Sequence, residues 1–549
     1  MQRWRFFLRF IVVLISLTLI AACAGKKPNI SIPTVIATLE KSYAPLETSI
    51  HTPPAAGTEQ TMLLETETGN LQPNEPANNA LTPSQTARPN TSPFATPTRN
   101  LPGSGDAYPV GSVPTVSFGQ PTESSNPYPV GTPTLPSANP NLPAGLQTGS
   151  AVFSLGSDSA TRENQFIDAT QTDQSAVWTY NAAQLTLLSL TINCSGNSSS
   201  LTNSLTSGLN ACLLAFDGST LNVGGGRAFT YGLGSAGLYA LGNATKIVAD
   251  QVTITTAGEN SRAVSAENGG SLQLSSVSLS TLAPFSPGVF VNLGTSAANL
   301  TDVTVTTLES SSPCLYTNAT LNATNTTCTA ERSETAVVEN NGALTLQDSK
   351  LTAVSPGRWG ALLYQSVSRD PRTAEAKFNM AGGSFTVTDI NSPAFFVTNV
   401  IGVINLRGVQ FRADSGIILR AGGQENWGAV GANGGSVTLV ANNQVLEGDI
   451  VSDRISSVVI QQRGNSHLTG AVNPSDTSRS LALSLDATST LTLTKNSYIP
   501  QISGVVLSDN HAINITGNNF NLYYDPALSS SLGGKTYQLT GGGSLLPHP

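Results

Sequence analysis

Charged residues are scarce in this chain, and basic residues do not outnumber acidic ones. Of the 549 residues, 11% are charged, and 26 lysines and arginines stand against 34 aspartates and glutamates, which gives a net charge of −8. Proteins that hold a nucleic acid need a surplus of basic side chains, because contacts with the phosphates dominate that binding. The composition therefore argues against nucleic acid as a partner.

Histidine and closely spaced cysteines, the usual ligands of transition metals, are also few. The four histidines lie far apart, at His51, His467, His511 and His548. No two of the five cysteines have the Cys-x-x-Cys spacing that is typical of structural zinc sites. We therefore expect neither a metal site nor a cofactor.

Long apolar runs are missing except near the N-terminus, where the pattern indicates an export signal. Three arginines are interspersed ahead of an apolar run at residues 10–20, which is short for a membrane-spanning helix. A single transmembrane anchor is the alternative. The next residues, Ile20-Ala21-Ala22-Cys23, resemble the bacterial lipobox. This resemblance implies that residues 1–22 are removed and that Cys23 is acylated, which would hold the protein at a membrane.

Periodic apolar residues are absent between Cys23 and residue 149, and proline is concentrated there. Of the 32 prolines, 21 lie between Pro28 and Pro143, among threonine, serine and asparagine. This composition is typical of extended, disordered segments. We predict that residues 23–149 form a disordered tether between the lipidated cysteine and a folded domain.

A short pattern recurs between Ala211 and Leu419. An aliphatic or aromatic residue that precedes a polar turn recurs at intervals of 22 to 33 residues, at Ala215, Ala240, Ala266, Val291, Tyr316, Val338, Leu363, Phe396 and Leu419. The nine residues from Ala266 match the nine from Val338 in type, and each ends in an alternating Leu-x-Leu. Alternation of this kind indicates a strand with one buried face, and a fixed repeat indicates stacked turns.

The repeat predicts an all-β fold, a right-handed parallel β-helix over residues 150–545, followed by a short tail at 546–549. The right-handed form is expected because parallel crossover connections favour that hand. An antiparallel sandwich or barrel is the alternative, since it also has short alternating strands. The longest interval follows Leu363, and its extra residues, Val367 to Arg372, are expected to form a solvated loop at one corner.

Four cysteines remain beyond Cys23, and they fall into two close pairs. Cys194 and Cys212 flank a segment that exceeds the normal repeat, and Cys314 and Cys328 lie within one short repeat. In an exported protein such spacing predicts disulfides. Pairing within each close pair is favoured, although four cysteines allow three pairings.

Catalytic motifs are not evident, although many parallel β-helices cleave polysaccharides. The sequence contains neither adjacent aspartates nor a Gly-His-Gly element. Asp449 and Asp453, with Arg454 beside them, are the nearest candidates for a carboxylate pair, but a charged turn explains them equally well. We expect no enzyme and no catalytic residue.

Several aromatic residues lie in or beside predicted turns, where they have the chemistry to stack on sugar rings. They are Trp359, Tyr364, Trp427, Tyr523 and Tyr524, of which Trp359, Tyr364, Trp427 and Tyr524 are the preferred candidates for ligand contact. Aromatic residues at such positions more often cover the core.

Residues 176 to about 545 resemble a family of exported bacterial β-helix lipoproteins, mostly uncharacterised and sometimes labelled carbohydrate-binding. The pieces that carry the resemblance include residues 333–339 and 362–366, Trp427-Gly428 with Asn433-Gly434-Gly435, and residues 524–527 with 532–537. The family implies no catalytic residues. We therefore expect a lipid-anchored protein at the outer face of a bacterial membrane, whose rod binds a surface glycan or another envelope polymer. A polysaccharide lyase or hydrolase is the alternative, and a purely structural spacer is the third.

Overall fold

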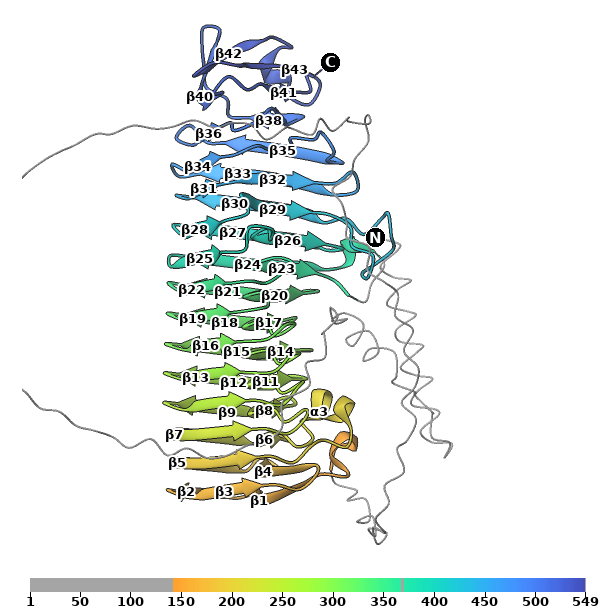
Figure 1. Cartoon of the computed structure of the whole chain (residues 1–549), viewed down its shortest axis with the longest axis vertical. Coiled ribbons are helices and arrows are strands. Elements are labelled where there is room, and N and C mark those ends of the chain that lie inside the picture. Colours follow the sequence, from red (N-terminus) through yellow and green to blue (C-terminus); the bar gives the residue numbers. More distant parts are fainter. Residues whose placement is uncertain (1–141, 367–369, 549) are drawn as a thin grey trace, which may run out of the picture. The chain divides into compact units, whose positions relative to one another are not determined.

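The computed structural model describes residues 142–366 and 370–548 (Figure 1). The predicted signal peptide, Cys23 and the tether up to residue 141 lie outside the described residues. The described chain winds into a parallel β-solenoid of about 16 turns between residues 150 and 547. The predicted solenoid is therefore confirmed, and the antiparallel sandwich or barrel is not what this sequence forms.

One side of the solenoid is a twelve-stranded parallel sheet, which we call the first sheet. Each turn adds one short strand, and the order is β1 (Ser150–Gly156), β4 (Gln174–Tyr180), β6 (Leu213–Phe216), β8 (Leu238–Leu241), β11 (Val264–Glu267), β14 (Val289–Asn292), β17 (Leu315–Thr317), β20 (Ala336–Glu339), β23 (Ala361–Tyr364), β26 (Phe395–Thr398), β29 (Ile417–Ala421) and β32 (Asp449–Ser452).

The second sheet has 22 strands, which form two parallel series because most turns add two strands separated by a bend. The first series contains β2 (Ser159–Glu163), β5 (Gln184–Cys194), β7 (Thr220–Thr230), β9 (Lys246–Asp250), β12 (Ser271–Ser275), β15 (Ala297–Thr301), β18 (Thr320–Thr324), β21 (Ala343–Gln347), β24 (Glu375–Ala381), β27 (Ile401–Arg407), β30 (Ser436–Asn442), β33 (Ser457–Arg463), β35 (Ser480–Leu485) and β38 (Gln501–Ser503). The second series contains β3 (Phe166–Ala169), the C-terminal halves of β5 and β7, β10 (Thr253–Thr256), β13 (Ser278–Thr281), β16 (Thr304–Thr307), β19 (Thr327–Ala330), β22 (Lys350–Ala353), β25 (Ser384–Val387) and β28 (Gln410–Ala413).

A third sheet completes the C-terminal turns. It contains β31 (Val445–Glu447), β34 (His467–Thr469), β36 (Thr490–Thr492), β37 (Ser497–Tyr498), β39 (Leu507–Ser508), β40 (His511–Thr516), β41 (Leu522–Tyr524), β42 (Tyr537–Thr540) and β43 (Ser544–Pro547). The two antiparallel strand pairs of the described chain, β39–β40 and β42–β43, both lie here. They end the stack with hairpins, so that no long parallel edge is left at this end.

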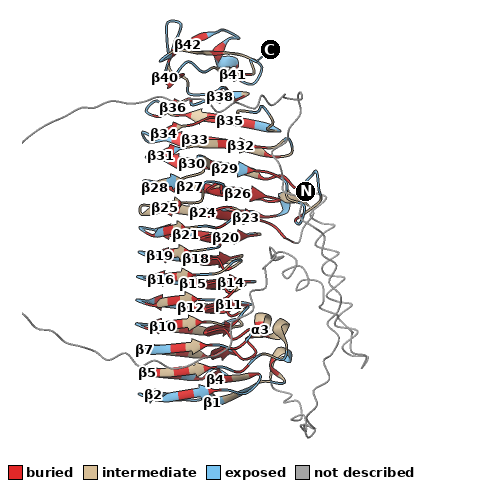
Figure 2. Cartoon of the chain, in the orientation of Figure 1, coloured by how far each residue is buried: buried red, intermediate tan, exposed pale blue. Residues whose placement is uncertain are grey.

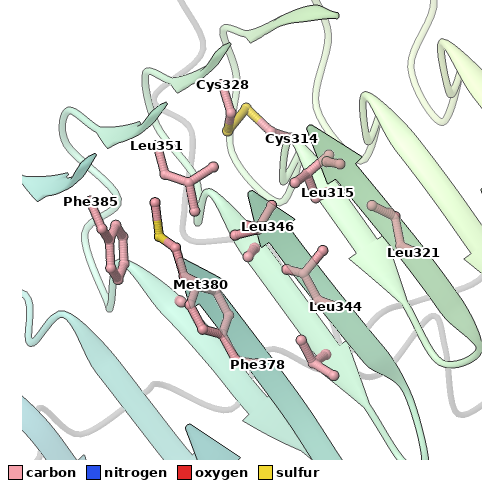
Figure 3. Packing of buried hydrophobic residues seen from close by; sticks show 14 of the residues in the cluster. Cys314, Leu315, Leu321, Cys328, Leu344, Leu346, Leu351, Phe378, Met380 and Phe385 are labelled. Carbon is pink, nitrogen blue, oxygen red and sulfur yellow. A yellow bond between two sulfur atoms is a disulfide. The ribbon is translucent and has the colours of Figure 1, made fainter. Parts of the chain in front are cut away.

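The core follows the alternation that the sequence predicts. In β12, Leu272 and Leu274 are buried, while Ser271 and Gln273 are not. Leu272 aligns through successive turns with equivalent apolar residues, among them Leu344 and Phe378, and together they form one continuous interior (Figures 2 and 3). Burial of such a column is the main favourable term for a repeat that cannot fold alone.

Residues with left-handed backbone make the bend between the two series. Gln251, Ser276, Asp302, Asn325 and Asp348 occupy equivalent positions after β9, β12, β15, β18 and β21, and their φ angles lie between 48° and 56°. Asparagine and aspartate tolerate this conformation best. The bend therefore recurs at the same place in each turn, which keeps the strands in register.

The register corrects three of the nine marker positions of the sequence repeat. Ala215, Ala240, Ala266 and Val291 stack on one another as predicted, but Val291 then pairs with Thr317 and Leu363 pairs with Val397. Tyr316 and Phe396 are thus one residue out of register, and the marker Leu419 should have been Ala421. A shift of one residue turns a side chain to the other face of a sheet, so Tyr316 and Phe396 lie on the outer face of the first sheet rather than in the main core.

Both disulfides join cysteines that are close in sequence, which is the pairing favoured by the sequence. Cys194 pairs with Cys212, and Cys314 pairs with Cys328, which faces the core (Figure 3). The segment between the first two, predicted only to exceed the normal repeat, contains a helix, α3 (Leu201–Ser207). Ser200 accepts a hydrogen bond from the backbone N–H of Asn203, and Gly208 ends the helix with a φ of 73°. A serine N-cap and a left-handed glycine are sufficient to define so short a helix.

Three 3-10 turns complete the secondary structure of the described chain: η1 (Ala144–Leu146), η2 (Pro371–Thr373) and η3 (Ser530–Leu532). Leu146 of η1 is fully buried against Trp178, Leu214 and Tyr239, which form a small cluster outside the main core. Ordered packing thus begins a few residues before Ser150.

Candidate functional site

Three of the four aromatic residues predicted to contact a ligand come together, and the fourth does not. Trp359, Tyr364 and Trp427 belong to one cluster on the outer face of the first sheet, where the Trp427 ring lies 4.6 Å from Tyr364 and 6.2 Å from Trp359. Tyr524 lies in the C-terminal turns, where its hydroxyl donates to the carbonyl of Lys535. All four side chains are buried. Their rings pack against protein in this structure.

Glu339 lies on the same outer face and has no cationic partner among the described residues. It is 2% exposed, and its carboxylate accepts hydrogen bonds from the hydroxyls of Tyr316 and Ser366. Burial raises the pKa of Glu339 from its ordinary value of 4.5 to about 7, although the hydroxyls of Ser366 and Tyr364 oppose that rise. Glu339 therefore retains its proton at mildly acidic pH.

A second buried carboxylate, Glu267, lies on this face with a cation beside it. The Oε1 atom of Glu267 lies 2.8 Å from Nη1 of Arg262, and Oε2 accepts from the amide of Asn292. The guanidinium of Arg262 stacks 3.5 Å from the ring centre of Phe290. Burial raises the pKa of Glu267 to about 7, with Arg262 acting in the opposite direction.

The two glutamates were missed by the sequence analysis, although a signal existed. Glu267 follows Ala266 and Glu339 follows Val338, at the same position of two aligned repeats. The strands that carry them, β11 and β20, are three steps apart in the stack, which corresponds to about 14 Å at the usual strand spacing. Paired carboxylates of glycoside hydrolases lie roughly 5 to 9.5 Å apart. This pair does not match that geometry.

The carboxylates proposed from sequence, Asp449 and Asp453, accept hydrogen bonds from backbone N–H groups, and Asp449 also forms an ion pair with a lysine. Asp449 accepts from the backbone N–H of Ala471 and lies 2.8 Å from Nζ of Lys495. Asp453 accepts from the backbone N–H groups of Gly423 and Ile455. These contacts give both residues structural roles, Asp449 at the start of β32 and Asp453 in the turn that follows it.

A cavity of about 640 Å³ lies at the corner between the first and second sheets, and we call it the corner cavity. It is lined by Asp370, Pro371, Arg372, Gly431, Ala432, Gly434, Ser436, Arg454, Ile455 and Arg479. Its volume is in the range of small-ligand sites. The described residues of its lining include three arginines and one aspartate, whereas the whole chain is acidic.

Two insertions of the repeat form this cavity. The first lies between β23 and β24, and Asp370 there accepts from both the backbone and the guanidinium of Arg372. The second lies between β29 and β30 and is held by Asn433, whose amide donates to the carbonyls of Trp427 and Gln424. Gly428 and Gly431 have φ angles of 76° and 83°, which other residues rarely adopt. The buried ring of Trp427 ties this loop to the outer face of the first sheet.

Arg454 and Arg479 come from the short corners of the two following turns. Both side chains are exposed, and neither forms an ion pair with a carboxylate in residues 142–366 and 370–548. In contrast, Arg372 already holds Asp370 through two parallel hydrogen bonds of 2.9 and 3.0 Å. The cavity thus offers two uncompensated guanidinium groups.

Comparisons with models of protein families, with curated proteins and with solved structures found no match to this chain. The parallel β-solenoid is therefore established by the structure alone. Within the described ranges, no group of three or more histidine, cysteine, aspartate or glutamate side chains is placed to hold a metal ion. None of the helices in those ranges is long and apolar enough to cross a membrane.

Proposed function

We propose that this protein is an exported, lipid-anchored surface protein whose solenoid binds an envelope or surface polymer by contact, without catalysis. The corner cavity is the observation that carries the proposal. It is formed by two insertions of the repeat, between β23 and β24 and between β29 and β30, and loops on a rigid scaffold commonly carry binding function.

The N-terminal sequence supports the proposed export and lipid anchoring. The lipobox-like Ile20-Ala21-Ala22-Cys23 and the proline-rich residues 23–149 are the features of a lipidated protein with a spacer. The resemblance of residues 176 to 545 to exported β-helix lipoproteins points to the same setting. Replacing Cys23 by alanine should release the protein from the membrane fraction and abolish labelling by a fatty acid; retention of both would contradict the anchor.

Binding is tested with the full-length chain on a glycan array and on whole bacterial cells. A variant in which residues 423–434 are replaced by a short Gly-Ser linker should lose binding, because one wall of the corner cavity is then missing. Replacement of Asp509 and Asn510, in the C-terminal β39–β40 hairpin, with serine is the control and should leave binding unchanged. Absence of binding by the unaltered chain to every glycan and cell would refute the proposal.

An enzymatic role is tested in parallel. Reducing ends and unsaturated products are measured after incubation with neutral and acidic polysaccharides. Turnover by the unaltered protein would replace the binding role with that of a lyase or hydrolase.

A further inference from the structure

We propose that the corner cavity binds the carboxylate groups of an acidic polysaccharide that lies along the solenoid axis, with Arg454 and Arg479 as its main partners. This inference rests on the proposed binding function and specifies its ligand and its residues. It follows from the charge of the cavity, from its extent along the stack and from the nature of its lining.

The charge of the cavity favours an anion. Arg454 and Arg479 line it without a carboxylate partner in the described chain, and Arg372 contributes a third guanidinium. Guanidinium groups match carboxylates with two parallel hydrogen bonds. The cavity contains one example of this geometry, because Asp370 binds Arg372 in that way. A ligand carboxylate would make the same contact with Arg454 or Arg479.

The extent of the cavity favours a polymer over a small anion. Its lining residues precede β24, β30, β33 and β35, and the starts of β24, β27, β30, β33 and β35 pair in sequence up the stack. Four steps separate β24 from β35, which corresponds to about 19 Å. Arg454 and Arg479 lie one step apart, and Arg372 lies three to four steps from them, so a single carboxylate cannot contact all three guanidinium groups, whereas a chain with a carboxylate on successive units can.

The lining favours a polysaccharide over an acidic peptide. Peptides are commonly bound by strand addition at a sheet edge or through apolar anchor pockets. The strands next to this cavity are paired on both sides within the stack, and among the described residues that line it Pro371 and Ile455 are the only larger apolar ones. The remaining lining is glycine, alanine, serine and charged side chains, which suits hydroxyl and carboxylate groups of sugars.

The test measures binding of the full-length chain to immobilised polygalacturonate, with dextran as the neutral polymer, dextran sulfate as the sulfated one and polyglutamate as the acidic peptide. We expect polygalacturonate to bind best and its affinity to fall as salt is added, because exposed charge pairs are screened. The Arg454→Gln and Arg479→Gln variants should each weaken binding by about tenfold, the cost of one charge-assisted contact.

Matched controls are provided by Arg407→Gln and Arg463→Gln. These exposed arginines end β27 and β33, at the opposite end of the same strands, and they do not line the cavity. They remove the same charge and should change the affinity less than twofold. Asp370→Asn should tighten binding severalfold, since it frees Arg372 and keeps an oxygen to cap η2.

The outcomes separate this inference from the broader function. Equal losses in the control and cavity variants, or tighter binding of dextran, dextran sulfate or polyglutamate than of polygalacturonate, would overturn the inference while binding itself stands. No binding of the unaltered chain to any polymer, to the glycan array or to cells would overturn both.

Discussion

Glu339 illustrates how one buried side chain sets a pH dependence in an otherwise apolar β-structure. Its carboxyl group accepts hydrogen bonds from hydroxyls and from the backbone of Ser366 but has no cationic partner among the described residues, so desolvation dominates and raises its pKa to about 7. The folded protein therefore retains a proton that the unfolded chain releases near the ordinary value of 4.5. Stability contributed by this proton is complete below pH 4.5 and is lost as the pH rises through 7.

The first prediction concerns this residue. As the pH rises from 4.5 to 7, the raised pKa of Glu339 should lower the free energy of unfolding by on the order of 3 kcal/mol, since one pKa unit corresponds to about 1.4 kcal/mol. Glu339→Gln removes the titrating group, so its denaturant midpoint should fall less between pH 5 and pH 8 than that of the unaltered chain. Glu447→Gln, an exposed change, is the control. An unchanged pH profile in Glu339→Gln would contradict the assignment.

Among the single elements, the insertions are the main departures of this solenoid from a regular repeat. The segment that contains α3 covers the first sheet near Tyr239, whose hydroxyl donates to the carbonyl of Leu205. The same carbonyl accepts from Arg262, which links the helix to the buried ion pair with Glu267. The Cys194–Cys212 disulfide closes both ends of this segment.

The second prediction tests that closure. Replacing Cys194 and Cys212 together by serine should cost about 3 kcal/mol of unfolding free energy, the usual value for a loop of this length. It should also increase hydrogen exchange in residues 201–207, because the ends of the segment are no longer joined. The matched variant, with Cys314 and Cys328 as serine, should lose a similar amount of stability and leave exchange in α3 unchanged. Equal protection of α3 in both variants would show that the helix is held by packing alone.

At the scale of the whole solenoid, stability depends on turns that match their neighbours rather than on any single turn. In the central turns each strand pairs with that of the next turn in constant register, and the apolar columns run through the stack. In such repeat structures, stability is approximately a sum of repeat and nearest-neighbour terms. Removal of a complete turn should therefore be tolerated, while removal of part of a turn should not.

The third prediction applies this reasoning to one turn. Ile254 pairs with Leu279, so deletion of residues 255–279 joins equivalent positions and removes both Arg262 and Glu267. We expect a folded protein with β-type circular dichroism and a cooperative melt. Deletion of residues 255–267 removes the same ion pair but joins positions out of register, and it should abolish cooperative unfolding. Comparable melts for both deletions would show that register does not govern the stack.

The sequence by itself determined the parallel solenoid, the preference for disulfides within each close cysteine pair, and two of the three insertions, those after Cys194 and after Leu363. The insertion between β29 and β30 was not predicted. Strand alternation and a repeat of about 25 residues are local properties, and cysteines close in sequence in one turn are close in space. The tertiary structure alone decided which face each side chain occupies and which loops meet. Tyr316 and Phe396 were predicted on the wrong face because spacing alone does not show where a turn gains its extra residues: Val291 to Thr317 is 26 residues and Leu363 to Val397 is 34. The corner cavity joins residues from Asp370 to Arg479 that are far apart in the chain, and only the stacking of turns brings them together.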